Sequence, residues 1–170
     1  MNVVIKTSFG EIEVVLAPAQ APQTVANFVR YVRAGAYTDG CFWRTVVLHP
    51  DNQPANDIKI AVIQATCRAD FVKYDAIAME QTGTTGLMHR DGTISMARFA
   101  PDSAQADFFI CIGDQPELDQ GGRRNPDGWG FAAFGDVIRG MDVVRRIQRQ
   151  PQEEQRLTPA ITINRVHIVE

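Results

Sequence analysis

Apolar residues in this chain come in short segments, and this feature most restricts the fold. The longest uninterrupted apolar run covers only residues 108–112. Near the N-terminus, Ile12, Val14 and Leu16 alternate with Glu11 and Glu13 after a turn at residues 8–10. A period of two across a glycine-containing turn is typical of a β-hairpin with one buried face. Similar strand-like segments recur along the chain, and we expect seven or eight of them.

Only two segments have the periodicity of a helix. In the first, which begins near Pro22 and ends at Gly35, the apolar residues lie three or four positions apart, at Val25, Phe28, Val29 and Val32. In the second, Met141, Val144 and Ile147 form an apolar face. Two helices are too few to connect that many parallel strands, so the sheet should be mainly antiparallel. Many short strands joined by long loops favour a closed barrel, which has no exposed edges.

Two local irregularities are also expected. Residues 49–57 contain two prolines and several Asn and Asp residues, which predict an extended loop. In the last strand, the alternation of Ile161, Ile163, Val166 and Ile168 changes phase near Asn164, as a β-bulge would cause.

Length and charge exclude several classes of protein. The 170 residues suit a single domain, 1–170, that buries a full core. A net charge of −3 gives no electrostatic reason to bind nucleic acid or anionic lipid. A membrane-spanning helix needs roughly 20 apolar residues, so no membrane span is expected. The N-terminus has no secretory signal pattern and the three cysteines are scattered, so we expect a cytoplasmic protein. We also expect a monomer.

The common motifs of metal and cofactor chemistry are missing. There is no His-Glu-x-x-His or Cys-x-x-Cys sequence, and His49, His89 and His167 stand far apart. No glycine-rich phosphate loop and no nucleophile elbow occur. We therefore expect neither a metal nor a cofactor.

What remains is a set of polar side chains placed singly within apolar strands. Arg44 follows Phe42 and Trp43, and Gln64 comes near the end of an apolar stretch that covers residues 58–64. A third segment, residues 95–110, contains Phe108 and Phe109, which must point to opposite faces of a strand because they are adjacent.

In these segments the chain resembles the cyclophilins, a family of peptidyl-prolyl cis-trans isomerases. The motifs that carry the resemblance follow the family order, and together they cover nearly the whole chain. They are GEI (10–12), APQTVANF (21–28), GAY (35–37), FWR (42–44), SMAR (95–98), FFI (108–110), GWGFAAFG (128–135) and GMDVV (140–144). The resemblance implies a closed eight-stranded antiparallel barrel capped by two α-helices. It also implies an enzyme that isomerises Xaa-Pro bonds in peptides and in unfolded or flexible proteins.

The resemblance also assigns roles to residues. Arg44 matches the catalytic arginine of the family, and Gln64 matches the glutamine that orients substrate and arginine. The remaining positions are matched to substrate binding: Phe109, Val62 and Leu118 as apolar walls, Ala97 and Arg98 through their backbone, and Phe131 where many members have histidine or tyrosine.

Two further candidate substrate-binding residues depart from the family pattern. Trp43 stands where histidine is usual, and Asp107 stands where glutamine is usual. An aspartate close to Arg44 could form an ion pair with it and either hold the guanidinium in place or restrain it.

Other interpretations remain open from the sequence. The same barrel could bind proline-containing peptides without catalysis, or it could hold a small ligand unrelated to proline. Arg44 could instead be a structural residue paired with a carboxylate, and Trp43 could serve only in packing.

Overall fold

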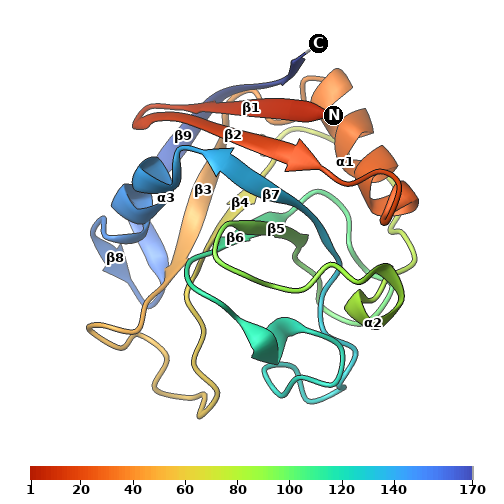
Figure 1. The fold of residues 1–170 in the computed structure, drawn as a ribbon. Coiled ribbons are helices and arrows are strands. Elements are labelled where there is room, and N and C mark those ends of the chain that lie inside the picture. The colour runs from red at the N-terminus through yellow and green to blue at the C-terminus, as the bar shows by residue number, and fades with distance from the viewer. Residues whose placement is uncertain (170) are drawn as a thin grey trace.

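The structure, a computed structural model, describes residues 1–169 and contains a closed antiparallel β-barrel (Figure 1). Its strands follow the order β1-β2-β7-β5-β6-β4-β3-β9, and β9 pairs with β1 to close the barrel. The eight strands are β1 (Asn2–Thr7), β2 (Gly10–Leu16), β3 (Gly40–Val46), β4 (Val62–Thr66), β5 (Thr93–Met96), β6 (Phe108–Cys111), β7 (Ala133–Arg139) and β9 (Arg156–Val169). The predicted eight-stranded antiparallel barrel is therefore confirmed.

The two predicted helices, α1 (Pro22–Arg33) and α3 (Met141–Gln148), pack against the barrel. Three short elements were not predicted: the single helical turn α2 (Thr82–Thr85), the 3₁₀ turn η1 (Pro116–Leu118), and the strand β8 (Gln152–Glu153), which pairs only with β9. Among residues 1–169, no helix has the length and apolar character needed to cross a membrane.

One strand begins later than the sequence predicts. Residues 58–61 are not part of β4, although they continue its apolar pattern. The side chain of Gln53 explains this, because its amide takes both main-chain groups of Ile60: Oε1 accepts from the N–H at 3.0 Å, and Nε2 donates to the carbonyl at 2.9 Å. The N–H and carbonyl of Ile60 are therefore already bonded to Gln53 and cannot pair with a neighbouring strand.

The predicted bulge in the last strand is present. Lys6 pairs with Arg165, whereas the next residue, Thr7, pairs with Ile163, so Asn164 is the extra residue. The strand itself is longer than expected and begins at Arg156.

The barrel interior is filled by aromatic side chains from the strands and from α1. Phe108 lies among Phe28, Tyr37 and Phe42, with ring centroids 5.4–6.0 Å apart. The helix contributes the face that its periodicity predicted, since Val25, Phe28, Val29 and Val32 are all buried. A small ligand inside the barrel is therefore excluded, because core side chains occupy that space.

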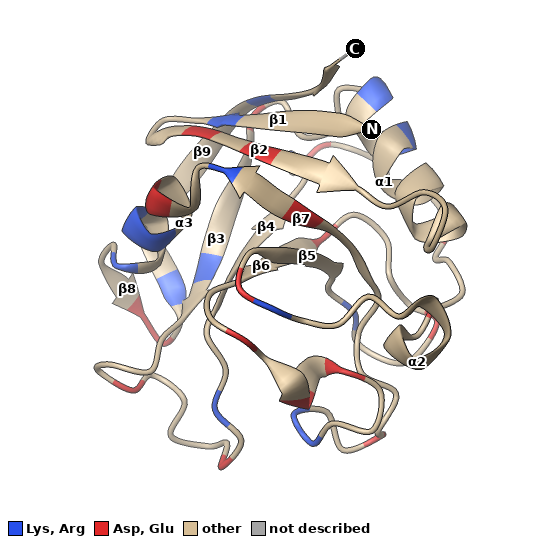
Figure 2. Ribbon diagram, viewed as in Figure 1, with Lys and Arg blue, Asp and Glu red and all other residues tan. Residues whose placement is uncertain are grey.

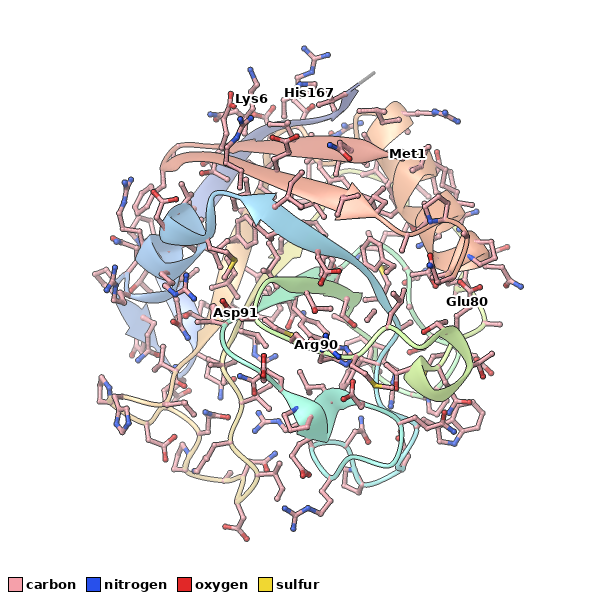
Figure 3. The ribbon with its side chains drawn as sticks, viewed as in Figure 1. Met1, Lys6, Glu80, Arg90, Asp91 and His167 are labelled. Carbon is pink, nitrogen blue, oxygen red and sulfur yellow. The ribbon has the colours of Figure 1, made fainter. Side chains whose placement is uncertain are left out.

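Helix α1 receives its N-terminal cap from a distant residue. Its own N-cap residue, Ala21, has no side chain that can cap, but Glu80 accepts hydrogen bonds from the backbone N–H of Thr24 at 2.7 Å and from its hydroxyl at 2.6 Å. Figure 3 shows Glu80 between α1 and α2. A carboxylate at this end also interacts favourably with the helix dipole, so this contact ties the long 67–92 segment to the barrel.

We predict that Phe108→Ala lowers the free energy of unfolding by about 3–5 kcal/mol, because it removes a fully buried ring and leaves a cavity. The matched control is Phe99→Ala, since the Phe99 side chain is 96% exposed and its loss should change stability by less than about 0.5 kcal/mol. Chemical denaturation followed by tryptophan fluorescence measures both. Equal effects of the two substitutions would contradict this placement of the core.

Candidate active site

A second apolar cluster lies on the outer face of the strands whose inner face fills the barrel. It consists of Val46, Ile60, Val62, Phe109, Cys111 and Leu118, with Ala97 and Phe131 packed against it. Phe108 and Phe109 thus lie on opposite faces of β6, the first in the barrel core and the second in the outer cluster. Because side chains alternate along a strand, the same strands supply both the barrel core and the outer site.

A bulge at Trp43 places Arg44 on this outer face. Phe42 pairs with Ala65 and Arg44 pairs with the next residue, Gln64, so Trp43 is the extra residue in β3. Without it, Phe42 and Arg44 would share a face, because side chains alternate along a strand. With it, Phe42 lies in the barrel core while Arg44 reaches the outer side.

The strand register then places the polar side chains of Arg44 and Gln64 beside the apolar ring of Phe109. Arg44 is the direct partner of Gln64, Gln64 of Phe109, and Phe109 of Ser95, so one row crosses four strands. Directly opposite residues have their Cβ atoms about 4.5–5.5 Å apart. The guanidinium, the amide and the aromatic ring are therefore neighbours because of pairing alone.

These side chains line a cavity of about 390 Å³. All ten residues that the sequence singled out contribute to it: Trp43, Arg44, Val62, Gln64, Ala97, Arg98, Asp107, Phe109, Leu118 and Phe131. Four more lining residues were missed, namely Ile60, Phe99, Arg124 and Asn125. All four belong to loops, where the sequence pattern gives no direction for a side chain.

The apolar floor of the cavity is held by aromatic contacts. Phe131 meets Phe109 edge-on, with ring centroids 5.5 Å apart, and His89 stacks on Phe109 at 5.9 Å. His89 is itself fixed, because its two ring nitrogens lie 2.7 Å from an Asp119 carboxylate oxygen and 2.8 Å from the Ser95 hydroxyl. The Phe109 ring therefore has little freedom to turn.

Arg44 is fixed by amide oxygens rather than by a carboxylate. Its Nη1 donates to Oε1 of Gln64 at 2.9 Å, and its Nε donates to Oε1 of Gln155 at 2.9 Å. Within residues 1–169 no carboxylate lies at ion-pair distance from it. Burial lowers the pKa of Arg44, although a guanidinium keeps its charge at neutral pH. The interpretation of Arg44 as half of a structural ion pair is therefore wrong.

Asp107 acts on Gln64 and not directly on Arg44. Its carboxylate accepts from Nε2 of Gln64 at 3.4 Å and from the Thr66 hydroxyl at 2.6 Å, and Lys73 lies 3.5 Å away. The expected Asp107–Arg44 ion pair is not formed. Instead, Asp107 orients the Gln64 amide so that its oxygen faces the guanidinium.

The Arg98 side chain supports one wall of the cavity. It forms a two-pronged ion pair with Asp127, at 2.8 and 3.0 Å, and its guanidinium lies 4.8 Å from the centre of the Phe131 ring. The neighbouring Ala97 is fixed through its backbone N–H, which donates to the Asp107 carbonyl at 3.0 Å.

Residues 1–169 contain no group of three or more His, Cys, Asp or Glu side chains that could hold a metal ion. Figure 3 shows His167 on the side of the barrel opposite the η1 loop.

Burial raises the pKa of the thiols of Cys41, Cys67 and Cys111, which disfavours their reactive thiolate forms.

Comparison with known proteins identifies the family. The model of the cyclophilin type peptidyl-prolyl cis-trans isomerases matches residues 2–168. The chain belongs to the cyclophilin family. A peptidyl-prolyl cis-trans isomerase of Streptomyces antibioticus is 36% identical over 86% of this chain and 82% of its own length. Peptidyl-prolyl cis-trans isomerase B of Escherichia coli is 34% identical over 86% of this chain and 83% of its own length.

A solved structure shows the same fold. The cyclophilin type isomerase of Cryptosporidium parvum, determined in the presence of the dipeptide Ala-Pro, superposes with a TM-score of 0.78. The match covers 100% of this chain and 99% of the other, at 20% sequence identity.

The residue of this cyclophilin that sequence reasoning missed most clearly is Gln155. It lies in the turn between β8 and β9, where Glu154 and Gln155 both have positive φ values, 50° and 72°. Besides accepting from Arg44, its amide donates to the Asn52 carbonyl at 3.1 Å. No local signal could reveal this, because Gln155 and Arg44 are 111 positions apart.

We predict that Gln155→Ala lowers kcat of this cyclophilin by about tenfold and leaves KM nearly unchanged, because it frees Nε of Arg44 without touching the apolar floor. Gln155→Glu keeps an acceptor oxygen for Nε of Arg44 but adds a carboxylate that competes with the substrate, so it should restore only part of kcat. A protease-coupled assay on an Ala-Pro peptide measures both, with Gln150→Ala as the control, since the Gln150 amide bonds only to its own helix at the Arg146 carbonyl. A change confined to KM would contradict a positioning role.

Proposed function

We propose that this cyclophilin accelerates rotation about Xaa-Pro peptide bonds by binding the twisted amide in the 390 Å³ cavity. The observation that carries the proposal is the Arg44 guanidinium, which is charged, partly buried and held by two amide oxygens beside an aromatic floor. Family membership supports the same activity.

The chemistry needs no covalent bond to the substrate. Rotation about the peptide bond has a barrier of ~18–20 kcal/mol because it destroys the amide resonance. In the twisted state the prolyl nitrogen regains a lone pair, and a fixed donor that faces this nitrogen binds that state better than either planar form. Arg44 retains Nη2 for this purpose, because its other two nitrogens already donate to Gln155 and Gln64.

The walls of the cavity suit a proline ring. Phe109, Phe131, Leu118 and Val62 offer a compact apolar surface next to the row of polar groups. We place the residue that precedes proline against the backbone at Ala97 and Arg98, as the family resemblance implies. Proline-containing segments of unfolded or flexible proteins are the substrates that can reach such an open cavity.

A module that only binds proline peptides is not favoured. A site that only binds apolar proline rings has no need for a partly buried cation. Burying Arg44 without a carboxylate partner costs free energy, because the charge loses hydration. The chain of contacts from Asp107 through Gln64 to Arg44 fixes that cation at the edge of the apolar floor. This arrangement is useful for stabilising the twisted amide.

We predict that Arg44→Ala lowers kcat/KM by about 10²–10³-fold, the usual effect of removing one donor that stabilises a transition state. Arg44→Lys should recover little of it, because an ammonium cannot donate to Gln64 and Gln155 from one planar fork.

The measurement is NMR exchange between the cis and trans forms of an Ala-Pro peptide. The control is Arg165→Ala, which removes an equal charge from an exposed position on β9. Full activity in Arg44→Ala would refute the mechanism, and binding of the peptide without acceleration by the unsubstituted protein would refute the function.

A further inference from the structure

A third arginine lines the cavity together with Arg44 and Arg98. Arg124 lies in the loop between η1 and β7 and lines the same cavity. Figure 1 shows that this loop and the 47–61 loop extend from the same end of the barrel, and Figure 2 shows basic positions in both loops and on β3. The cavity thus has three arginines on its wall, of which Arg98 is paired with Asp127, in a protein whose net charge is −3.

The Arg124 side chain is held by only one of its three nitrogens among residues 1–169. Its Nη1 donates to Oε1 of Gln53 at 2.8 Å and to the carbonyl of Ile58. The Gln53 side chain is buried, with 2% exposed, and its amide also bonds Val47 and Ile60, so it is a rigid anchor. Within residues 1–169, Nε and Nη2 of Arg124 make no hydrogen bond, which leaves two donors for a ligand.

Three carboxylates of the neighbouring loops are engaged by other cations, and Asp57 of the 47–61 loop forms no ion pair with a described residue. Glu117 pairs with Arg123 at 3.0 Å and Asp51 pairs with Lys59 at 2.8 Å. Asp127 is held by Arg98 as described above. Arg124 itself has no carboxylate at ion-pair distance among residues 1–169.

The electrostatic state of Arg124 agrees with a missing counterion. Its pKa is lowered by burial and, secondarily, by repulsion from Arg44. An anion bound beside Arg124 would relieve both effects, because it replaces lost hydration and offsets the like charge. A carboxylate suits a guanidinium especially well, since two N–H groups can donate to its two oxygens.

The position of Arg124 indicates which part of a substrate it would meet. A second hollow of about 150 Å³ adjoins the cavity on the side of Ala97, Arg98 and Asp107, where the residue before proline is placed. Arg124 instead contacts the 47–61 loop through Gln53 and Ile58, which do not line that hollow. With the substrate placed as proposed above, Arg124 would therefore face the chain that follows the proline.

We propose that Arg124 makes this enzyme selective for substrates with an acidic side chain on the residue that follows proline. The proposal rests on the proposed isomerase function and adds a substrate class to it. Asp and Glu at that position would accept hydrogen bonds from the free nitrogens of Arg124, whereas Lys and Arg would be repelled by Arg124 and Arg44.

The test compares kcat/KM for three peptides, with Glu, Gln or Lys directly after an Ala-Pro bond. We expect the unsubstituted enzyme to favour Glu over Lys by roughly tenfold, a usual size for a partly screened charge pair. The ratio should fall when ionic strength rises from about 0.01 M to about 1 M, because salt screens exposed charges. This arm needs no variant and does not depend on how a substitution folds.

Variants locate the effect. Arg124→Met should bring the Glu-to-Lys ratio close to one, and Arg124→Glu should invert it, whereas Arg90→Gln removes an equal charge away from the cavity and should keep the original ratio. Equal kcat/KM for Glu and Lys in the unsubstituted enzyme would overturn the proposal, as would an unchanged Glu-to-Lys ratio in Arg124→Met. Failure to isomerise even the Gln peptide would refute the proposed function instead, so the two failures are distinguishable.

Discussion

The register of β3 against β4 is the constraint on which the rest of the site depends. These strands fill the barrel with one face and line the cavity with the other, so a shift of one residue would exchange core and site. The extra residue at Trp43 is what allows Phe42 to remain in the core while its near neighbour Arg44 reaches the cavity. Main-chain pairing therefore determines where the side chains of the row from Arg44 to Phe109 lie.

A cation without a carboxylate partner is the second feature that organises the site. A carboxylate beside Arg44 would lower the cost of burying it, but it would also compete with the substrate for the same donor. Amide oxygens from Gln64 and Gln155 fix the geometry and leave the charge uncompensated. Asp107 contributes its negative charge one step further away, through Gln64, where it orients without neutralising.

The sequence predicted features that depend on local patterns and missed those that depend on distant contacts. Both helices, the antiparallel barrel and the bulge at Asn164 follow from periodicity and turn residues, and all three are present. The family resemblance named ten residues that do line one cavity. In contrast, the Trp43 bulge and the role of Gln155 are set by partners far along the chain, which no short sequence window contains. The late start of β4 is set by a side chain only seven positions upstream, but periodicity does not reveal which main-chain groups that side chain will bond.

Gln53 joins parts of the molecule that would otherwise vary separately. One buried amide closes the 47–61 loop on itself and also anchors Arg124 from a loop 71 positions away. The same 47–61 segment reaches Gln155 through the Asn52 carbonyl. Grafting this loop from a relative with a shorter connection would thus remove a support from both arginines at once. A change in this loop should consequently alter both the turnover that depends on Arg44 and the proposed selectivity that depends on Arg124.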